Sequence, residues 1–217
     1  MKKILLISTS HNEMNGHPTG LWLEELAQPY NVFKEAGFEI EIASILGGEV
    51  PIDVVSIPDG VPTEYEHVMP LLKNTKKLSD FANVEFDAIV FAGGHGPLTD
   101  FTSTKEVKDI ITSTYNKGNI VAGVCHGVAA LLNIKENDGK YFIDGKTLTG
   151  FTNTEEDLAQ LSSLVPYALE TELVKQGANF ERAGDFVEYV SVDKNLITGQ
   201  NPQSSDKMAK VIVEKLK

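Results

Sequence analysis

The chemistry of this chain centres on its single cysteine, Cys125, which ends an apolar run and is followed at once by His126. The run at 120–124 is typical of a buried strand, and residues 127–132 favour a helix directly after it. Such a turn exposes the side chain at the carboxyl edge of a sheet, where the helix N-terminus is expected to lower the pKa of the thiol. Free backbone N–H groups there can also hold a developing oxyanion. The pattern predicts a cysteine nucleophile, against the alternative of a small buried apolar residue.

A glycine-rich segment, Gly93, Gly94 and His95, follows a second apolar run at 86–91. Ligands of open α/β sheets bind beyond the carboxyl ends of the strands, and glycines there allow the backbone to approach closely. We therefore expect this segment to border a substrate pocket, although a plain turn would look the same. It is neither a dinucleotide-binding fingerprint nor a Walker A loop, because the required spacings are absent.

Acid–base chemistry also needs carboxyl groups, and the first candidate is Glu25. In the helix expected at 21–36 it shares a face with Leu21 and Trp22, and such apolar neighbours would raise its pKa. Glu24 is the competing candidate. Either carboxylate can also be a solvated helix residue.

A second acidic cluster covers residues 155–157. Thr154 and Asp157 fit the Ser/Thr-x-x-Asp/Glu capping pattern, and acidic residues in a first helical turn complement the helix dipole. Glu155, Glu156 and Asp157 are therefore structural by default. One of them can still orient a histidine.

No metal or cofactor is expected. His11, Glu13 and His17 lie close together in the sequence, but in a loop rich in Asn, Gly and Pro. The single cysteine excludes an intrachain disulfide and the zinc sites that need two or four thiolates.

Composition narrows the classes of partner. The 217 residues include 19 Lys and Arg against 31 Asp and Glu, a net charge of −12. Such a charge argues against general nucleic-acid binding and against docking on anionic membranes. The N-terminal apolar run is too short for a signal peptide, and no run approaches the length of a membrane span. The expected compartment is the cytoplasm.

Short apolar runs alternate with longer helical periods, which indicates βαβ units and a parallel sheet. We expect one domain over 1–217, with residues 50–83 and 163–190 as additions to a minimal α/β core. Strands are predicted at 3–8, 38–43, 86–91, 120–124, 146–148, 186–192 and 196–198, and helices at 21–36, 65–81, 105–117, 127–132 and 204–216.

Four motifs together resemble the PfpI superfamily, whose fold is that of class I glutamine amidotransferases. They are TGLWLEE at 19–25, FAGGHGPLTDF at 91–101, VAGVCHG at 121–127 and TGFTNTEED at 149–157. They occur in the family's order along essentially the whole chain. The match is to the glyoxalase III and chaperone branch, which is related to Parkinson disease protein seven. The resemblance implies a flavodoxin-like three-layer sandwich, with helices on both faces of a mostly parallel sheet, and a homodimer.

The resemblance also implies roles for individual residues. Cys125 matches the nucleophile, His126 the catalytic histidine, and Glu25 the helix glutamate that hydrogen-bonds the thiol. The acidic partner of the histidine falls on Glu156, with Glu155 as the alternative one residue away. Backbone N–H groups of Gly94 and His126 would form the oxyanion hole, and Trp22, Gly93 and His95 would border the pocket.

The leading functional hypothesis is a glyoxalase that needs no glutathione, metal or nucleotide. It would convert methylglyoxal or a similar 2-oxoaldehyde into a 2-hydroxy acid through a hemithioacetal on Cys125. The same site would also suit a protein deglycase or a cysteine hydrolase such as a peptidase. A holdase chaperone, or a redox sensor based on oxidation of Cys125, is the alternative without turnover.

Overall fold

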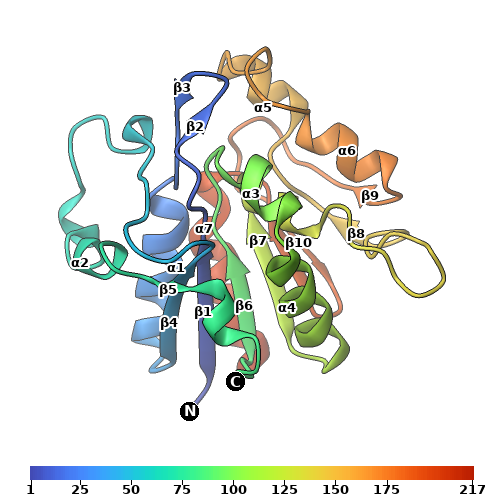
Figure 1. Ribbon diagram of the computed structural model, residues 1–217, viewed down its shortest axis with the longest axis horizontal. Coiled ribbons are helices and arrows are strands. Elements are labelled where there is room, and N and C mark those ends of the chain that lie inside the picture. The colour runs from blue at the N-terminus through green and yellow to red at the C-terminus, as the bar shows by residue number, and fades with distance from the viewer.

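The computed structural model describes residues 1–217 and contains one seven-stranded sheet (Figure 1). Its strand order is β10-β11-β7-β6-β1-β4-β5, and every neighbouring pair is parallel except β10 with β11. Along the chain, the five central parallel strands have the order 2-1-3-4-5, which is that of flavodoxin. The predicted fold class is confirmed. The strands are β1 Lys3–Ser8, β4 Glu39–Ser44, β5 Lys76–Lys77, β6 Ala88–Phe91, β7 Ile120–Val124, β10 Val190–Asp193 and β11 Leu196–Gly199.

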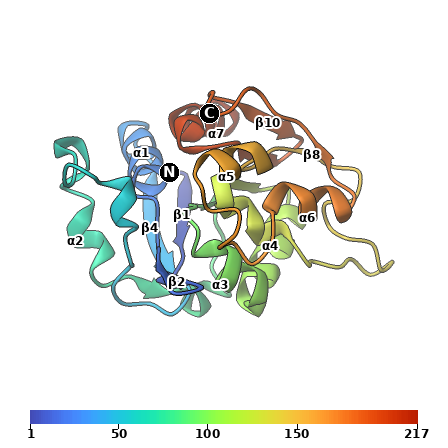
Figure 2. The ribbon, with the colours of Figure 1, turned by 90° about the horizontal axis from the view of Figure 1, so that it is seen from above.

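Helices cover both faces of this sheet, as Figure 2 shows from above. Helices α1 (Glu24–Glu35) and α7 (Ser205–Leu216) pack together on one face. On the other face lie α3 (Pro97–Ser103), α4 (Lys105–Asn116) and the 3₁₀ helix η4 (Cys125–Leu131).

Smaller elements lie around this core. They are the hairpin β2 Glu13–Met14 and β3 His17–Pro18, the pair β8 Thr147–Leu148 and β9 Asn179–Phe180, helices α2 Met69–Leu72, α5 Asn153–Leu158 and α6 Leu169–Lys175, and 3₁₀ helices η1 Val54–Ser56, η2 Thr63–Tyr65, η3 Leu78–Phe81 and η5 Pro202–Ser204.

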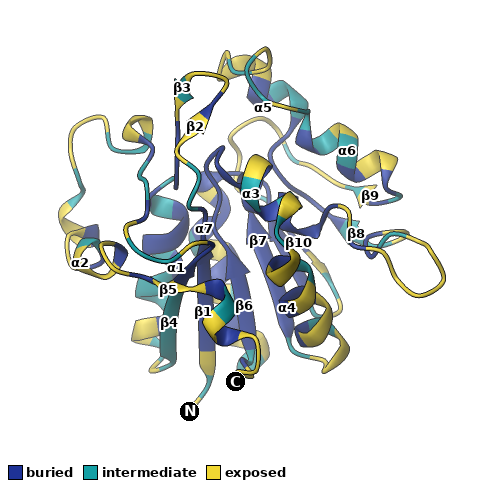
Figure 3. Cartoon of the chain, in the orientation of Figure 1, coloured by how far each residue is buried: buried dark blue, intermediate teal, exposed yellow.

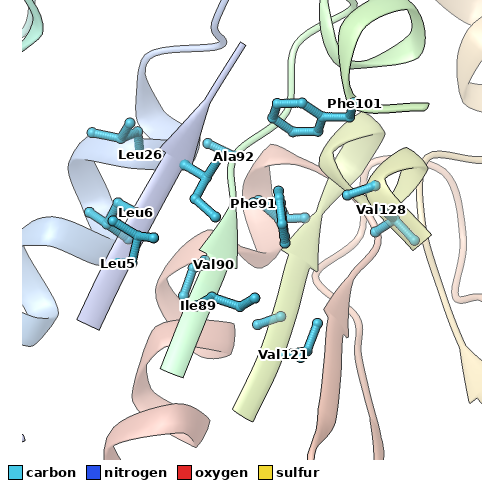
Figure 4. Close-up of a cluster of buried hydrophobic side chains, with 14 of the residues drawn as sticks. Leu5, Leu6, Leu26, Ile89, Val90, Phe91, Ala92, Phe101, Val121 and Val128 are labelled. Atoms are coloured by element: carbon cyan, nitrogen blue, oxygen red, sulfur yellow. The ribbon is translucent and has the colours of Figure 1, made fainter. Parts of the chain in front are cut away.

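The central strands form because their sequences are apolar throughout rather than alternating. Strands β6 and β7 are buried at every position, as expected for parallel strands covered on both faces (Figure 3). Figure 4 shows side chains from neighbouring strands and helices meeting in one core cluster. Phe101 packs edge-on against Phe91, with ring centroids 5.3 Å apart and an interplanar angle of 71°.

The predicted helix at 65–81 is wrong. The segment instead contains η2, α2, β5 and η3, because its backbone is taken up by the sheet edge. Thr75 exchanges backbone hydrogen bonds with Gly48, and its hydroxyl bonds to that of Ser44 at 2.7 Å. Pairing with other segments thus overrides a helical pattern in the sequence.

Four other predicted elements differ in their boundaries, their pairing or their helix type. Helix α1 begins at Glu24 rather than at 21, because Leu21 bonds through its backbone to Pro51 and Asp53. The strand predicted at 186–192 is shortened to β10, since Phe186 lies in a turn. The strand predicted at 146–148 pairs with β9, outside the main sheet. The helix after Cys125 is a 3₁₀ helix.

The single-domain assignment and the status of 50–83 and 163–190 as additions remain predictions. The structure places β5, from the first of these segments, at the edge of the sheet. None of the helices is both long and apolar enough to span a membrane.

We expect Phe101→Ala to destabilise the fold by about 3–5 kcal/mol, because Phe101 is fully buried and its removal leaves a cavity beside Phe91. Urea unfolding should show a lower midpoint with an unchanged slope. The control is Val192→Ala, at a position 44% exposed, which should change stability by no more than about 0.5 kcal/mol. Equal effects of the two substitutions would contradict this view of the core.

Candidate active site

Cys125 lies at the junction of β7 and η4, with its backbone in the left-handed region at φ 55°. Few non-glycine residues adopt this conformation, which concentrates at functional sites. The turn is tight because Gly127 passes close to β6: a Cβ on Gly127 would lie 2.3 Å from the carbonyl oxygen of Phe91. The sequence thus folds into an elbow that holds the thiol at the carboxyl edge of the sheet, 3% exposed.

Glu25 approaches the thiol from the start of α1. Its side chain is fully buried, its Oε2 accepts a hydrogen bond from the backbone N–H of Gly93 at 2.8 Å, and its carboxyl contacts the sulfur of Cys125. Burial raises the pKa of Glu25 well above its usual range, outweighing the hydrogen bonds from Cys125 and Gly93. Glu24, the competing candidate, is only partly buried and pairs with Trp22.

The predicted low pKa of the Cys125 thiol is wrong. Burial raises the pKa of Cys125 well above its usual range, and negative charge on Glu25 raises it further, while the backbone N–H of His126 lowers it only in part. The two groups therefore form a coupled pair in which each disfavours the charge of the other. A protonated Glu25 relieves this repulsion and can donate a hydrogen bond to a thiolate.

His126 stands on the other side of the thiol, with its Nδ1 3.4 Å from Sγ of Cys125. Its Nε2 lies 2.6 Å from Oε2 of Glu156, the first acidic residue of α5 to face the site. A carboxylate accepts from Nε2–H, which leaves Nδ1 as the acceptor facing the thiol. Burial, and then His95, lower the pKa of His126, so the imidazole is neutral at rest.

A second imidazole shares the same carboxylate. Nε2 of His95 lies 2.7 Å from Oε1 of Glu156, and the ring centroids of His95 and His126 are 4.1 Å apart. Burial alone raises the pKa of Glu156, but the two imidazoles outweigh it and hold that pKa well below its usual range. The motif at 91–101 predicted that His95 borders the pocket, but it did not indicate that His95 and His126 share Glu156 as a partner.

Glu155, the alternative partner of the histidine, points elsewhere. It forms a capping box with Thr152, and its Oε1 accepts from the side-chain amides of Gln200 and Asn201 at 3.0 and 2.8 Å. The same oxygen accepts from the backbone N–H of Phe186 at 2.8 Å. Glu155 therefore ties α5 to the loop before β10, and Glu156 faces the two histidines.

The side chains that meet at Cys125 open into a pocket of about 350 Å³. Segments distant in sequence contribute to its wall, and reasoning from local motifs could not have brought them together. The lining residues are His17, Trp22, Asp53, Val55, Gly94, His95, Cys125, His126, Phe151, Ala159, Leu161, Phe186, Pro202 and Gln203. Trp22, Gly94 and His95 thus lie where the sequence predicted, whereas Gly93 lies behind the wall and binds Glu25.

Gly94 is held against the neighbouring backbone at φ 89°. A Cβ at this position would lie 2.1 Å from the carbonyl oxygen of Gly20 and 2.6 Å from the backbone nitrogen of Trp22. Only glycine fits such a conformation at such close range. Its backbone therefore borders the pocket with no side chain of its own to cover it.

Only one group of residues has its potential ligand atoms close enough for a metal ion. These atoms, from His95, His126 and Glu156, lie within 4.8 Å of one another. They already bond to one another at 2.6 and 2.7 Å, distances that leave no space for an ion between them. His11, Glu13 and His17 do not form such a group.

The sequence model of the DJ-1/PfpI family matches residues 19–215. The chain is 33% identical to Glyoxalase 3 of Candida albicans, over 98% of each chain, and 30% identical to the glutathione-independent glyoxalase HSP31 of Saccharomyces cerevisiae, over 100% of this chain and 98% of that protein.

Solved structures agree in fold over the full length. The crystal structure of glyoxalase III from Candida albicans superposes with a TM-score of 0.88 at 32% identity, covering 98% of this chain and 96% of that one. The X-ray structure of the Rapid Encystment Protein of Francisella tularensis superposes with a TM-score of 0.95 at 39% identity, over 100% of both chains.

The coupling of Cys125 with Glu25 is testable by alkylation. We expect Glu25→Gln to shift the pH profile of iodoacetamide labelling toward lower pH, because wherever Glu25 has lost its proton its charge raises the pKa of the thiol, and an amide carries no such charge. The measurement is the midpoint of the labelling rate against pH, which is less sensitive to access than the rate itself. The control is Glu24→Gln, which should leave the midpoint near that of the wild type. A midpoint that stays fixed or rises in Glu25→Gln would contradict the coupling.

Proposed function

The chain belongs to the DJ-1/PfpI family, and we propose that it is a glutathione-independent glyoxalase. Its substrate would be methylglyoxal or a similar 2-oxoaldehyde, and its product the corresponding 2-hydroxy acid. The observation that carries the proposal is the linked series of contacts from the Cys125 thiol through His126 to Glu156 at the wall of the pocket. Full-length similarity to two proteins named glyoxalases supports it.

The first step is attack by sulfur. The neutral imidazole of His126 accepts the thiol proton at Nδ1, and Glu156 stabilises the imidazolium that forms. The thiolate of Cys125 then adds to the aldehyde carbon, C1, and the aldehyde oxygen takes up a proton. The product is a hemithioacetal.

The second step moves hydrogen from C1 to C2. A base removes the C1 proton to give an enediol, and reprotonation at C2 leaves a thioester at C1 and a hydroxyl at C2. C1 is oxidised while C2 is reduced, so no external oxidant or reductant is required. Water then hydrolyses the thioester, which releases the 2-hydroxy acid and regenerates the thiol. His126 is our candidate for the proton transfers.

Developing negative charge on the substrate oxygen would be held by backbone N–H groups of Gly94 and His126. Gly94 borders the pocket, and its lack of a side chain lets a substrate come close to the backbone. Glu25, with its raised pKa, would be protonated beside the thiolate and could relay a proton to or from the bound substrate.

A free small molecule suits this pocket better than a long peptide does. Asp53 and Val55, from the segment 50–83, line one wall, and Phe186 lines another, so the walls confine the space above Cys125. The homodimer and the cytoplasmic location belong to the same proposal and remain predictions.

Turnover should depend on the sulfur atom. Purified protein is expected to convert methylglyoxal to lactate without added glutathione, and Cys125→Ser should reduce kcat/KM by about 10³-fold or more, because a hydroxyl is far less nucleophilic than a thiol. Ser113→Ala, on the exposed side of α4, is the control and should match the wild type. If the Cys125→Ser variant turned over methylglyoxal as fast as the wild type, the proposed mechanism would be wrong.

We expect Glu156→Gln to lower kcat by about 10²–10⁴-fold, because an amide cannot accept from both imidazoles or stabilise an imidazolium. The matched substitution Glu155→Gln should act mainly on stability, since that carboxylate binds the loop before β10. Steady-state kinetics and thermal melting of both variants separate the two roles. A loss of kcat in Glu155→Gln, with Glu156→Gln active, would reverse the assignment.

A further inference from the structure

We propose that this pocket selects 2-oxoaldehydes with a bulky, uncharged apolar substituent of about the size of a phenyl ring, and that Phe186 determines this preference. The inference rests on the proposed function and concerns the part of the substrate that does not react. Its support comes from the size of the pocket, the composition of its wall and the way in which Phe186 is held.

The pocket is larger than methylglyoxal requires. Its volume is about 350 Å³, within the range of roughly 300–1,000 Å³ that is usual for ligand sites. A molecule with a single methyl substituent would leave much of the apolar wall without a contact.

An aromatic wall leads outward from the reacting sulfur. The ring of Phe151 lies 4.5 Å from that of His126, measured between centroids, and Phe186 lies 6.1 Å from Phe151 at an interplanar angle of 61°. Trp22 and Leu161 add further apolar surface to the pocket. A flat aryl group attached to C2 of the substrate could pack against these rings while C1 stays at Cys125.

The pocket wall offers a charged substituent no lysine, arginine or free carboxylate. No lysine or arginine lines the pocket, and the one carboxylate in its wall, Asp53, already accepts from the hydroxyl of Thr19 and the backbone N–H of Val55. Apart from the imidazoles of His17, His95 and His126, no cationic side chain would compensate an anionic substituent for its lost hydration. The wall favours a neutral apolar group.

Phe186 is fixed at the pocket by its backbone. It has φ 55°, a conformation that a bulky residue rarely adopts, and the residue is 40% exposed. Its N–H is bound by the buried Glu155, and Asn201 connects that same carboxylate oxygen to the carbonyl of Val187 at 2.9 Å. An apolar ring is thus held partly in solvent at the pocket wall, where a substrate would cover it.

The experiment compares glyoxal, methylglyoxal and phenylglyoxal as substrates, without glutathione. Wild-type protein should show a kcat/KM for phenylglyoxal at least about tenfold above that for methylglyoxal. Phe186→Ala should lower the phenylglyoxal value about tenfold, mainly through KM, and leave methylglyoxal within about twofold. Phe186→Leu should retain part of the preference. The control is Val187→Ala, the next residue along, which is 52% exposed and outside the pocket wall.

The outcomes separate the two proposals. If methylglyoxal is converted but phenylglyoxal is not preferred, or if Phe186→Ala affects both substrates equally, the selectivity inference is wrong and the glyoxalase proposal stands. If no 2-oxoaldehyde is converted by the wild type, both are wrong. Thermal melting of each variant shows whether a kinetic change reflects the pocket or a loss of fold.

Discussion

The left-handed backbone of Cys125 lies where the ends of β6 and β7 approach each other without intervening side chains. A Cβ on Gly127 would lie 2.3 Å from the carbonyl oxygen of Phe91, and one on Gly93 would lie 2.8 Å from that of Val124. Strain of this kind costs about 1–3 kcal/mol, and the buried strands on either side hold the turn in place. The same absence of side chains leaves the N–H of Gly93 free to bind Glu25. The close packing of backbone at the ends of β6 and β7 therefore supports three features. They are the turn at Cys125, the buried carboxyl of Glu25 and the pocket beside Gly94.

Two adjacent glutamates on α5 show how one helical turn serves both structure and chemistry. Successive helical residues point about 100° apart, so Glu155 and Glu156 cannot face the same partners. Glu155 accepts hydrogen bonds from Thr152, Phe186 and Asn201, which fixes the cap and the loop before β10. That anchoring sets the angle at which α5 presents Glu156 to the histidines. The position of the Glu156 carboxylate therefore depends on the hydrogen bonds that the Glu155 carboxylate accepts.

The sequence predicted the parallel sheet and the position of the cysteine well, because both depend on local patterns. Apolar runs at 3–8 and 120–124 coincide with β1 and β7, and the turn after the second run holds Cys125. The helix predicted at 65–81 failed because backbone pairing at the sheet edge, which no local pattern encodes, replaced it. The raised pKa of the thiol could not be foreseen either, since it follows from complete burial beside Glu25. The bond from His95 to Glu156 joins residues 61 positions apart and is set by the fold alone.

The distribution of charge within the site explains why these two carboxyl groups can do different work. Glu25 is buried among groups that do not neutralise it, so its pKa rises, whereas Glu156 lies between two imidazoles that hold its pKa low. One carboxyl therefore keeps its proton next to the sulfur, while the other keeps its negative charge behind the histidine. A proton leaving the thiol moves toward the anionic side, and a thiolate left behind faces a neutral donor. Because burial raises the first pKa and the two imidazoles lower the second, the direction of proton movement is built into the positions of α1 and α5.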